Sequence, residues 1–234
     1  MLAELKESVW KANIELAKSG LVILTFGNVS GIDRRRGILA IKPSGVPYDS
    51  LKAEDMVLVD LDGTVVDGWL SPSSDTPTHV EIYKAFEQVG GVAHAHSPYA
   101  TMFAQARREI PCLGTTHADQ FHGPVPVTRL LAEAEVAGAY EWNTGRIIVE
   151  RFAGLDPLEI PAALVAGHGP FTWGRTPAEA VETALILEQT AQMAVGSMAL
   201  DPRLGPLDSY IQEKHYSRKH GPDAYYGQKK ENER

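Results

Sequence analysis

The sequence predicts a layered α/β/α fold with a central mixed, largely antiparallel sheet. Strand-like segments gather early in the chain, where short turns separate them. Segments with helical periodicity open the chain, follow this group and return near its end. The two kinds of segment interleave without the regular alternation that parallel sheets require, so most strands are expected to pair antiparallel.

Helices are predicted where apolar residues recur at helical spacing or where a capping residue precedes proline. The first helix runs from Leu2 to a stop at Gly20. Proline stands at the first helical position in Thr76-Pro77, Ser97-Pro98 and Thr176-Pro177. The later helices are expected over residues 77–88, 98–107, 130–142 and 177–198.

Strands are predicted in the short apolar or alternating runs between these helices. The turn at residues 61–63 joins two of them as a hairpin. The expected strands cover residues 25–33, 38–42, 56–60, 64–66, 146–152 and 162–166, and a further one leads into His94 and His96.

Length and composition indicate one domain. The 234 residues are 44% hydrophobic and 22% charged, which suffices to bury one substantial core. We therefore expect residues 1–234 to form a single domain, with residues 229–234 as a frayed tail.

Charge and cysteine content restrict the partners and the compartment. A net charge of −8 argues against nucleic acid or an anionic membrane as a partner. The single cysteine, Cys112, allows no intramolecular disulfide, and no segment has the pattern of a signal peptide or a bilayer-spanning stretch. The expected location is the cytoplasm.

Two histidines two residues apart carry the clearest chemical signal. In an extended strand His94 and His96 share one face, while Ala93 and Ala95 point into a core on the other. His168 ends another apolar run and is flanked by glycines that expose its ring. Three imidazoles without cysteine suit an open catalytic metal site, although each histidine alone is equally consistent with a packed core or surface position.

Asp75 offers a carboxylate that suits this metal centre. It precedes a predicted helix, where it is either a fourth ligand, a base beside the ion, or simply an acid that caps the helix.

Three small, donor-rich loops predict a phosphate site. They lie at residues 27–31, at residues 42–45 and at Ser73-Ser74, the last beside a helix N-terminus that favours anions. Each loop alone is ordinary turn chemistry, but together they can surround one phosphate.

Two polar segments supply candidate proton-transfer groups. Residues 115–120 concentrate hydroxyls, an imidazole and the carboxylate of Asp119, which is either part of a polar loop or a general acid or base. Near the end, Tyr225 and Tyr226 offer phenols whose pKa a nearby cation can lower. Residues 210–234 hold more histidine and tyrosine than a disordered tail, so we expect them to fold against a partner subunit.

As a set, these motifs resemble a known family. They are Gly27-Asn28-Val29-Ser30, Lys42-Pro43-Ser44-Gly45, the run from Ser73 to His79, His94-Ala95-His96-Ser97, the run from Thr115 to Asp119, His168-Gly169-Pro170-Phe171, and His215-Tyr216 with Tyr225-Tyr226-Gly227-Gln228. Their order and spacing are similar to those of the class II (metal-dependent) sugar-phosphate aldolase and epimerase superfamily, and within it to the L-ribulose-5-phosphate 4-epimerases.

The resemblance implies a role for each candidate. It implies the class II aldolase-like fold, a homotetramer with active sites between subunits, a divalent metal of the zinc type and no organic cofactor. Three imidazoles with a carboxylate also accept Mn²⁺ or Co²⁺. The implied metal site is Asp75, His94, His96 and His168. The implied substrate-binding residues are Gly27, Asn28, Ser44, Gly45, Ser73, Ser74, Thr115, His215 and Arg218. The implied acid/base pair is Asp119 and Tyr226, with Tyr226, His215 and Arg218 reaching into the site of the adjacent chain.

The implied activity interconverts L-ribulose 5-phosphate and D-xylulose 5-phosphate. The hydrogen on C4 is not adjacent to the ketone, so inversion there requires that the C3–C4 bond break and form again. The aldolases of the superfamily carry glutamate where Asp75 stands, which favours the epimerase. An aldolase that releases its products and a non-catalytic interaction module of the same fold remain the alternatives, and arabinose and ascorbate catabolism fit the activity equally.

Overall fold

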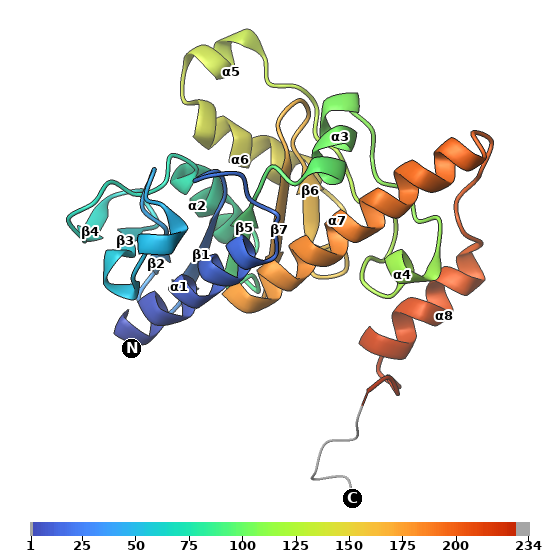
Figure 1. Ribbon diagram of the computed structural model, residues 1–234, viewed down its shortest axis with the longest axis horizontal. Coiled ribbons are helices and arrows are strands. Elements are labelled where there is room, and N and C mark those ends of the chain that lie inside the picture. The colour runs from blue at the N-terminus through green and yellow to red at the C-terminus, as the bar shows by residue number, and fades with distance from the viewer. Residues whose placement is uncertain (1, 228–234) are drawn as a thin grey trace, which may run out of the picture.

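Helices cover both faces of one seven-stranded sheet in the computed structural model, which describes residues 2–227 (Figure 1). The strands are β1 (Asn28–Asp33), β2 (Ile38–Ile41), β3 (Val57–Asp60), β4 (Val65–Asp67), β5 (Gly91–His94), β6 (Ala162–Leu164) and β7 (Pro170–Gly174). The α-helices are α1 (Leu2–Lys18), α2 (Thr76–Ala85), α3 (Pro98–Ala106), α4 (Thr115–Ala118), α5 (Glu133–Ala137), α6 (Tyr140–Arg151), α7 (Pro177–Leu200) and α8 (Ser209–His220). Two short 3₁₀ turns, Tyr48–Ser50 and Ala53–Asp55, lie between β2 and β3.

The strand order places the histidine strand near the middle of the sheet. The order is β4-β3-β2-β1-β5-β7-β6, and every ladder between neighbours is antiparallel. The predicted α/β class is therefore confirmed, and the sheet is antiparallel throughout its named strands rather than mixed. The parallel pairing found in the described chain is an isolated bridge between Val127 and Leu164.

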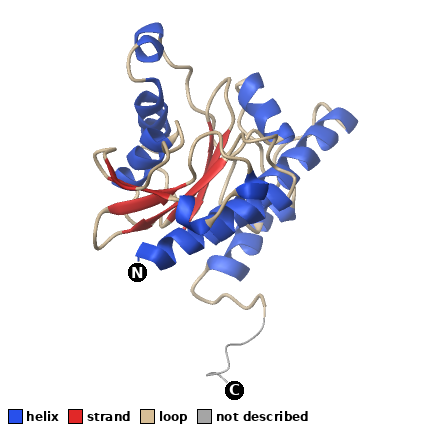
Figure 2. Ribbon diagram, turned by 60° about the vertical axis from the view of Figure 1, so that its left-hand side comes forward, coloured by secondary structure: helices blue, strands red, loops and turns tan. Residues whose placement is uncertain are grey.

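The two faces of the sheet carry different helices. Helices α1 and α7 pack on each other and on β1 and β5, while α2 and α6 pack together on the opposite side. Figure 2 shows the sheet in red between these two groups. No helix of the described chain has the length and apolar character needed to cross a bilayer.

Strand β5 obeys the predicted alternation. Val92 joins the larger core with α2 and α6, and Ala93 and Ala95 join a second core beneath α1 and α7. This confirms the expected orientation, although the regular strand ends at His94 and His96 lies in the segment that follows it.

The predicted strand over residues 146–152 is wrong. Its Ile147-Ile148-Val149 run is β-branched, but the segment forms the second half of α6. Thr144, Ile147 and Ile148 fall on one helical face and are buried, and α6 packs along α2. Tertiary packing therefore outweighs the local strand preference. The helix expected over residues 130–142 is replaced by the short α5 and the first turn of α6.

Three α-helices or strands were not predicted as such, and the short helix α4, expected as a polar segment, is one of them. Strand β7 follows His168 directly and pairs with both β5 and β6. Residues 209–220, expected only as an ordered polar segment, form α8, which packs on α4. The expected frayed tail, residues 229–234, lies outside the described residues.

Gly91 marks a close approach between β5 and the start of α7. A Cβ added at Gly91 would lie 2.4 Å from the backbone nitrogen of Pro177 and 2.4 Å from the carbonyl oxygen of Thr176. We therefore expect Gly91→Ala to lower the free energy of unfolding by about 3 kcal/mol or more in a denaturant titration. Gly196→Ala is the matched control, because that helical position is open and the change should raise stability by about 0.5 kcal/mol. Equal stability of the Gly91→Ala variant and the native chain would contradict the close approach.

Candidate active site

Three histidines from two distant parts of the chain converge at the end of β5. The Nε2 atom of His96 lies 3.1 Å from Nε2 of His94 and 3.1 Å from Nε2 of His168. The three ligand nitrogens all lie within 4.8 Å of one another. The predicted convergence of the imidazoles is therefore confirmed.

Backbone and aromatic contacts orient the His94 ring. Nδ1 of His94 lies 2.9 Å from the carbonyl oxygen of Pro170, which can only accept, so Nδ1 is the donor. The ring also stacks on Phe171, with centroids 4.2 Å apart. In the neutral form of this ring, Nε2 is the nitrogen with the lone pair, and it faces the other two histidines.

The donor set fits a divalent cation. Burial and the neighbouring His94 lower the pKa of His96, and burial with the same neighbour lowers the pKa of His168 to about 4. Neutral rings are the form that binds metal. A single proton on the Nε2 of His96 can satisfy only one of its two close contacts, whereas a cation would attract all three lone pairs.

Asp75 faces this cluster rather than capping its helix. It occupies the N-cap position of α2 but makes no side-chain cap hydrogen bond. Its Oδ2 lies 4.0 Å from Nε2 of His94 and accepts a hydrogen bond from Nδ2 of Asn28 at 2.7 Å. Burial alone would raise the pKa of Asp75, but the opposite effect of His94, His79 and the Asn28 hydrogen bond is larger. The net pKa is lower than usual, so the carboxylate is ionised. Asp75 therefore stands at the start of α2, as the cap alternative expected, but its carboxylate does not make the cap hydrogen bond.

A cavity of about 410 Å³ joins the histidines to the three donor-rich loops. Ten of the predicted site residues line it: Gly27, Asn28, Ser44, Gly45, Ser73, Ser74, Asp75, His94, His96 and His168. Asn28 links the two ends, because its Nδ2 also donates to Oγ of Ser73 at 3.1 Å. Residues of all three loops therefore line one cavity, together with the three histidines.

Comparison with known proteins places this site in a family. Residues 7–195 match the class II aldolase and adducin N-terminal domain. The chain belongs to the class II aldolase and adducin family. Curated relatives from Salmonella paratyphi C and Salmonella typhi, each called L-ribulose-5-phosphate 4-epimerase UlaF, are 51% identical over 97% of this chain and all of theirs.

Solved structures agree with the class II aldolase fold. An L-fuculose 1-phosphate aldolase superposes with a TM-score of 0.77 at 24% identity, covering 92% of this chain and 95% of its own. The L-fuculose 1-phosphate aldolase from Glaciozyma antarctica superposes with a TM-score of 0.76 at 21% identity, covering 95% and 84%. At these identities the likeness shows the fold, which is the predicted one.

Lys42 is a cavity residue that the sequence motif contained but to which no role was assigned. Its side chain is buried, and Nζ lies 4.8 Å from the centre of the Tyr48 ring and donates to the carbonyl oxygen of Pro43. Burial lowers the pKa of Lys42 to about 8. Lys42 therefore contributes a positively charged side chain to the lining of the cavity, in the same loop as Ser44 and Gly45.

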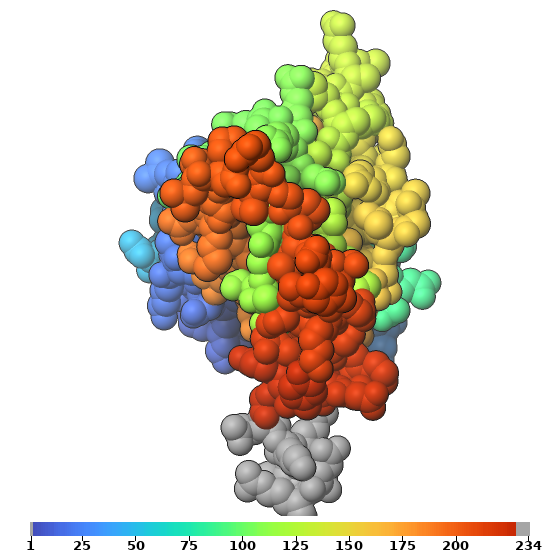
Figure 3. All heavy atoms as spheres, turned by 90° about the vertical axis from the view of Figure 1, so that its right-hand side faces the viewer, coloured from blue at the N-terminus to red at the C-terminus, as the bar shows by residue number. Residues whose placement is uncertain are grey.

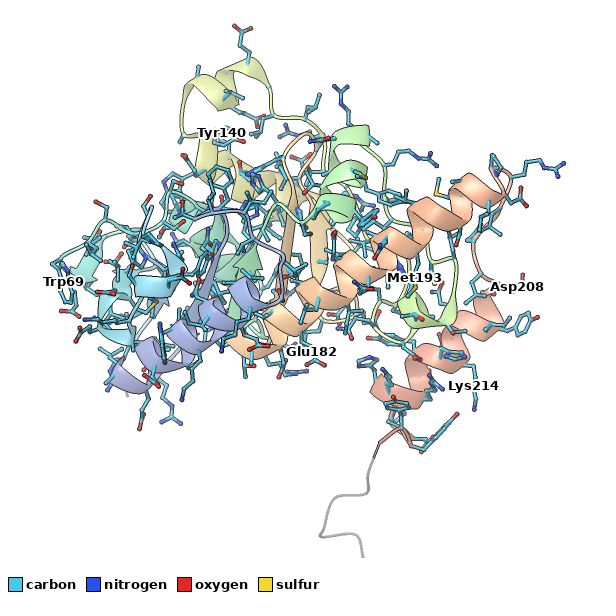
Figure 4. All side chains as sticks on the ribbon, in the orientation of Figure 1. Trp69, Tyr140, Glu182, Met193, Asp208 and Lys214 are labelled. Atoms are coloured by element: carbon cyan, nitrogen blue, oxygen red, sulfur yellow. The ribbon has the colours of Figure 1, made fainter. Side chains whose placement is uncertain are left out.

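Tyr140 and Glu141 also line the cavity and carried no sequence signal. Both stand in the first turn of α6, where Figure 4 labels Tyr140. They escaped prediction because the start of α6 was assigned to the end of another helix. Only the packing of α6 on α2 brings them to the site.

The remaining predicted residues form a separate cluster. Within the described chain, Thr115, Asp119, His215, Arg218 and Tyr226 do not line the histidine cavity. Asp119 instead accepts hydrogen bonds from Arg218, at 3.0 and 2.6 Å, and lies 3.0 Å from Nδ1 of His215. Figure 3 shows this C-terminal segment, in red, against the green segment that carries α4.

This second cluster is built on α4 and α8. Thr115 begins α4 and is exposed, and Tyr226 is 61% exposed beside the guanidinium of Arg218. Burial alone would raise the pKa of Asp119, but the opposite effect of the hydrogen bonds from Arg218 and His215 is larger. The net pKa is lower than usual, so the Asp119 carboxylate stays ionised. The class II aldolase chain thus carries its two groups of predicted site residues in two places.

Proposed function

We propose that this chain interconverts L-ribulose 5-phosphate and D-xylulose 5-phosphate by inverting C4. The observation that carries the proposal is one cavity that is lined by a three-histidine cluster, by Asp75 and by three donor-rich loops. The 51% identical relatives bear the name of this epimerase, which selects it within the family.

The substrate phosphate binds at the loop end of the cavity. The hydroxyls of Ser44, Ser73 and Ser74 and the backbone N–H groups of Gly45 and Ser74 donate to its oxygens, and the Lys42 ammonium offsets its charge. An acidic protein needs such a local site to hold an anion.

The sugar end lies against His94, His96 and His168, which hold a divalent cation in this proposal. Zn²⁺ is the first candidate, and Mn²⁺ and Co²⁺ suit the same ligands. Bound there, the cation supplies Lewis-acid stabilisation of negative charge on the substrate oxygens. Asp75 completes the ligand set or stands beside it, and no organic cofactor is needed.

The chemistry at C4 requires proton transfer from both faces of an aldehyde. A base removes the C4 hydroxyl proton, the O–H electrons form the C4 carbonyl, and the C3–C4 bond breaks with its electron pair left on the three-carbon fragment. The aldehyde fragment, glycolaldehyde phosphate, turns while its phosphate stays bound, and re-addition on the other face gives the epimer. The proposed acid/base groups are Asp119 and Tyr226.

Asp119 and Tyr226 come from a neighbouring copy of the chain in this proposal. They lie with His215 and Arg218 away from the cavity of their own chain, and Thr115 lies on the helix before Asp119. We propose a homotetramer in which this cluster completes the adjacent cavity. The proposed enzyme works in the cytoplasm, as one aldolase/epimerase domain, in pentose catabolism such as that of arabinose.

A coupled assay tests the proposed function. Purified protein is expected to form D-xylulose 5-phosphate from L-ribulose 5-phosphate, to lose this activity after chelation and to regain it when Zn²⁺, Mn²⁺ or Co²⁺ is restored. Accumulation of free glycolaldehyde phosphate without epimer would identify an aldolase that releases its products. No turnover by metal-loaded tetramer would refute both enzymes and favour an interaction module.

Lys42 provides a prediction with two opposite effects. We expect Lys42→Met to raise KM for the phosphorylated substrate at least about tenfold, because a phosphate partner is lost. The same change should raise the free energy of unfolding at pH 7 without ligand by on the order of 1 kcal/mol, because a buried ammonium to which no described carboxylate is paired is then replaced by an apolar side chain.

The pH dependence of stability checks the same substitution. Between pH 8 and the ordinary lysine value of 10.5, Lys42 keeps its proton in the unfolded state of the unmutated protein but loses it in the folded state. The free energy of unfolding therefore rises with pH in this window. Denaturant titrations should find this rise in the native chain and a smaller one in Lys42→Met. Identical pH slopes would show that Lys42 keeps its ordinary pKa.

A further inference from the structure

Glu188 is a buried acid in the middle of α7 that the proposed mechanism does not use. Its side chain is 5% exposed, and both oxygens are occupied. Oε1 accepts a hydrogen bond from the backbone nitrogen of Tyr99 at 2.9 Å, and Oε2 accepts one from Ala100 at 3.0 Å. A carboxylate this deep in the protein is held by two backbone donors of another helix.

Those two donors are the free N–H groups at the start of α3. The N-cap residue, Ser97, makes no side-chain cap hydrogen bond, and Pro98 has no N–H. The next two N–H groups are unpaired within their helix, and the N-terminal end of a helix is electropositive. Glu188 therefore replaces the missing cap of α3 from a distance of 88 residues along the chain.

Helix α3 contacts the two loops that carry His96 and His168. His96 stands two residues before its first residue, Pro98. Near its other end, the carbonyl oxygen of Ala104 accepts a hydrogen bond from the nitrogen of Gly167, the neighbour of His168. On the face between, Oγ1 of Thr101 is 3.6 Å from where a Cβ on Gly169 would stand. The position of α3 thus determines where the imidazoles of His96 and His168 lie.

We infer that Glu188 is a positioning residue for the metal centre: by fixing the first turn of α3 it holds His96 and His168 at the spacing that one cation requires. This inference rests on the proposed metal site. Glu188 does not line the histidine cavity. Its carboxylate acts through the α3 backbone, as outer-shell partners of metal ligands commonly do.

Titration of metal-free protein with Co²⁺ tests the inference without an activity assay. The visible absorption of Co²⁺ reports ligand geometry, and competition with a chelator reports affinity. Glu188→Gln keeps the size of the side chain but turns an NH₂ group toward one backbone N–H. Glu182→Gln is the matched control, because Glu182 is exposed on the same helix (Figure 4).

We expect Glu188→Gln to weaken Co²⁺ binding at least about tenfold and to change the absorption bands, while Glu182→Gln changes neither. If Glu188→Gln melts at a lower temperature but keeps native affinity and spectrum, Glu188 is purely structural and the inference is wrong. If Glu188→Gln does not fold, Glu188→Asp decides: it keeps the charge with a shorter reach, and native affinity in that variant would equally overturn the inference. Failure of the native protein to bind Co²⁺ would instead refute the proposed metal site, and the inference with it.

Discussion

Replacing His96 with asparagine is expected to remove the bound metal and the epimerase activity together. His96 is the middle member of the cluster, with its Nε2 3.1 Å from Nε2 of both His94 and His168. The asparagine amide is too short to reach the same point, so two imidazoles remain. Loss of Lewis-acid stabilisation worth several kcal/mol corresponds to a fall in kcat of about a thousandfold or more.

Metal analysis of purified protein, alongside the coupled assay, checks this result. His122→Asn is the control for metal content, because His122 lies outside the cavity and bonds to Glu159 and Glu213. That variant should retain its metal. An active His96→Asn protein that carries no metal would defeat the metal-assisted mechanism.

Mixing two inactive variants is expected to restore activity if neighbouring chains share each site. His96→Asn lacks a metal ligand, and Tyr226→Phe lacks the proposed acid/base phenol, which is exposed and distant from the cavity of its own chain. We expect each variant alone to lose at least about a hundredfold in kcat. In a mixed tetramer, a site works when one chain supplies His96 and its neighbour supplies Tyr226.

Random assembly fixes the size of the recovery. Each of the two conditions holds with a chance of one half, so co-expression in equal amounts should restore about a quarter of native activity per site. Tetramers of each variant alone are the control. No recovery in verified mixed tetramers would place Tyr226 and the histidines of one site on the same chain, and Tyr226→Phe with native activity would remove that phenol from the chemistry.

Local signals predicted much of this fold and most of the cavity. Pro77, Pro98 and Pro177 mark helix starts because proline at the first helical position is a property of the backbone itself. The face shared by His94 and His96 follows from strand geometry. In both cases the determining interaction lies within a few residues of the signal.

Interactions between distant segments account for the errors and omissions. Ile147 and Ile148 have strand preference but lie in α6, because α2 offers them a buried surface. Glu141 reaches the cavity through that same packing and had no motif of its own. The separation of Asp119 from the histidines likewise depends on how α4 and α8 pack. The sequence motifs of α4 and α8 do not indicate whether their residues belong to the site of their own chain or of a neighbouring chain.

His96 and His168 stand 72 positions apart in the chain. A peptide containing only one of these loops therefore lacks the three-histidine cluster, which needs the pairing of β5 with β7. Binding by the native state alone would couple the free concentration of the ion to the folding equilibrium. A shortage of the metal would then make the protein more susceptible to proteolysis, in addition to abolishing its activity.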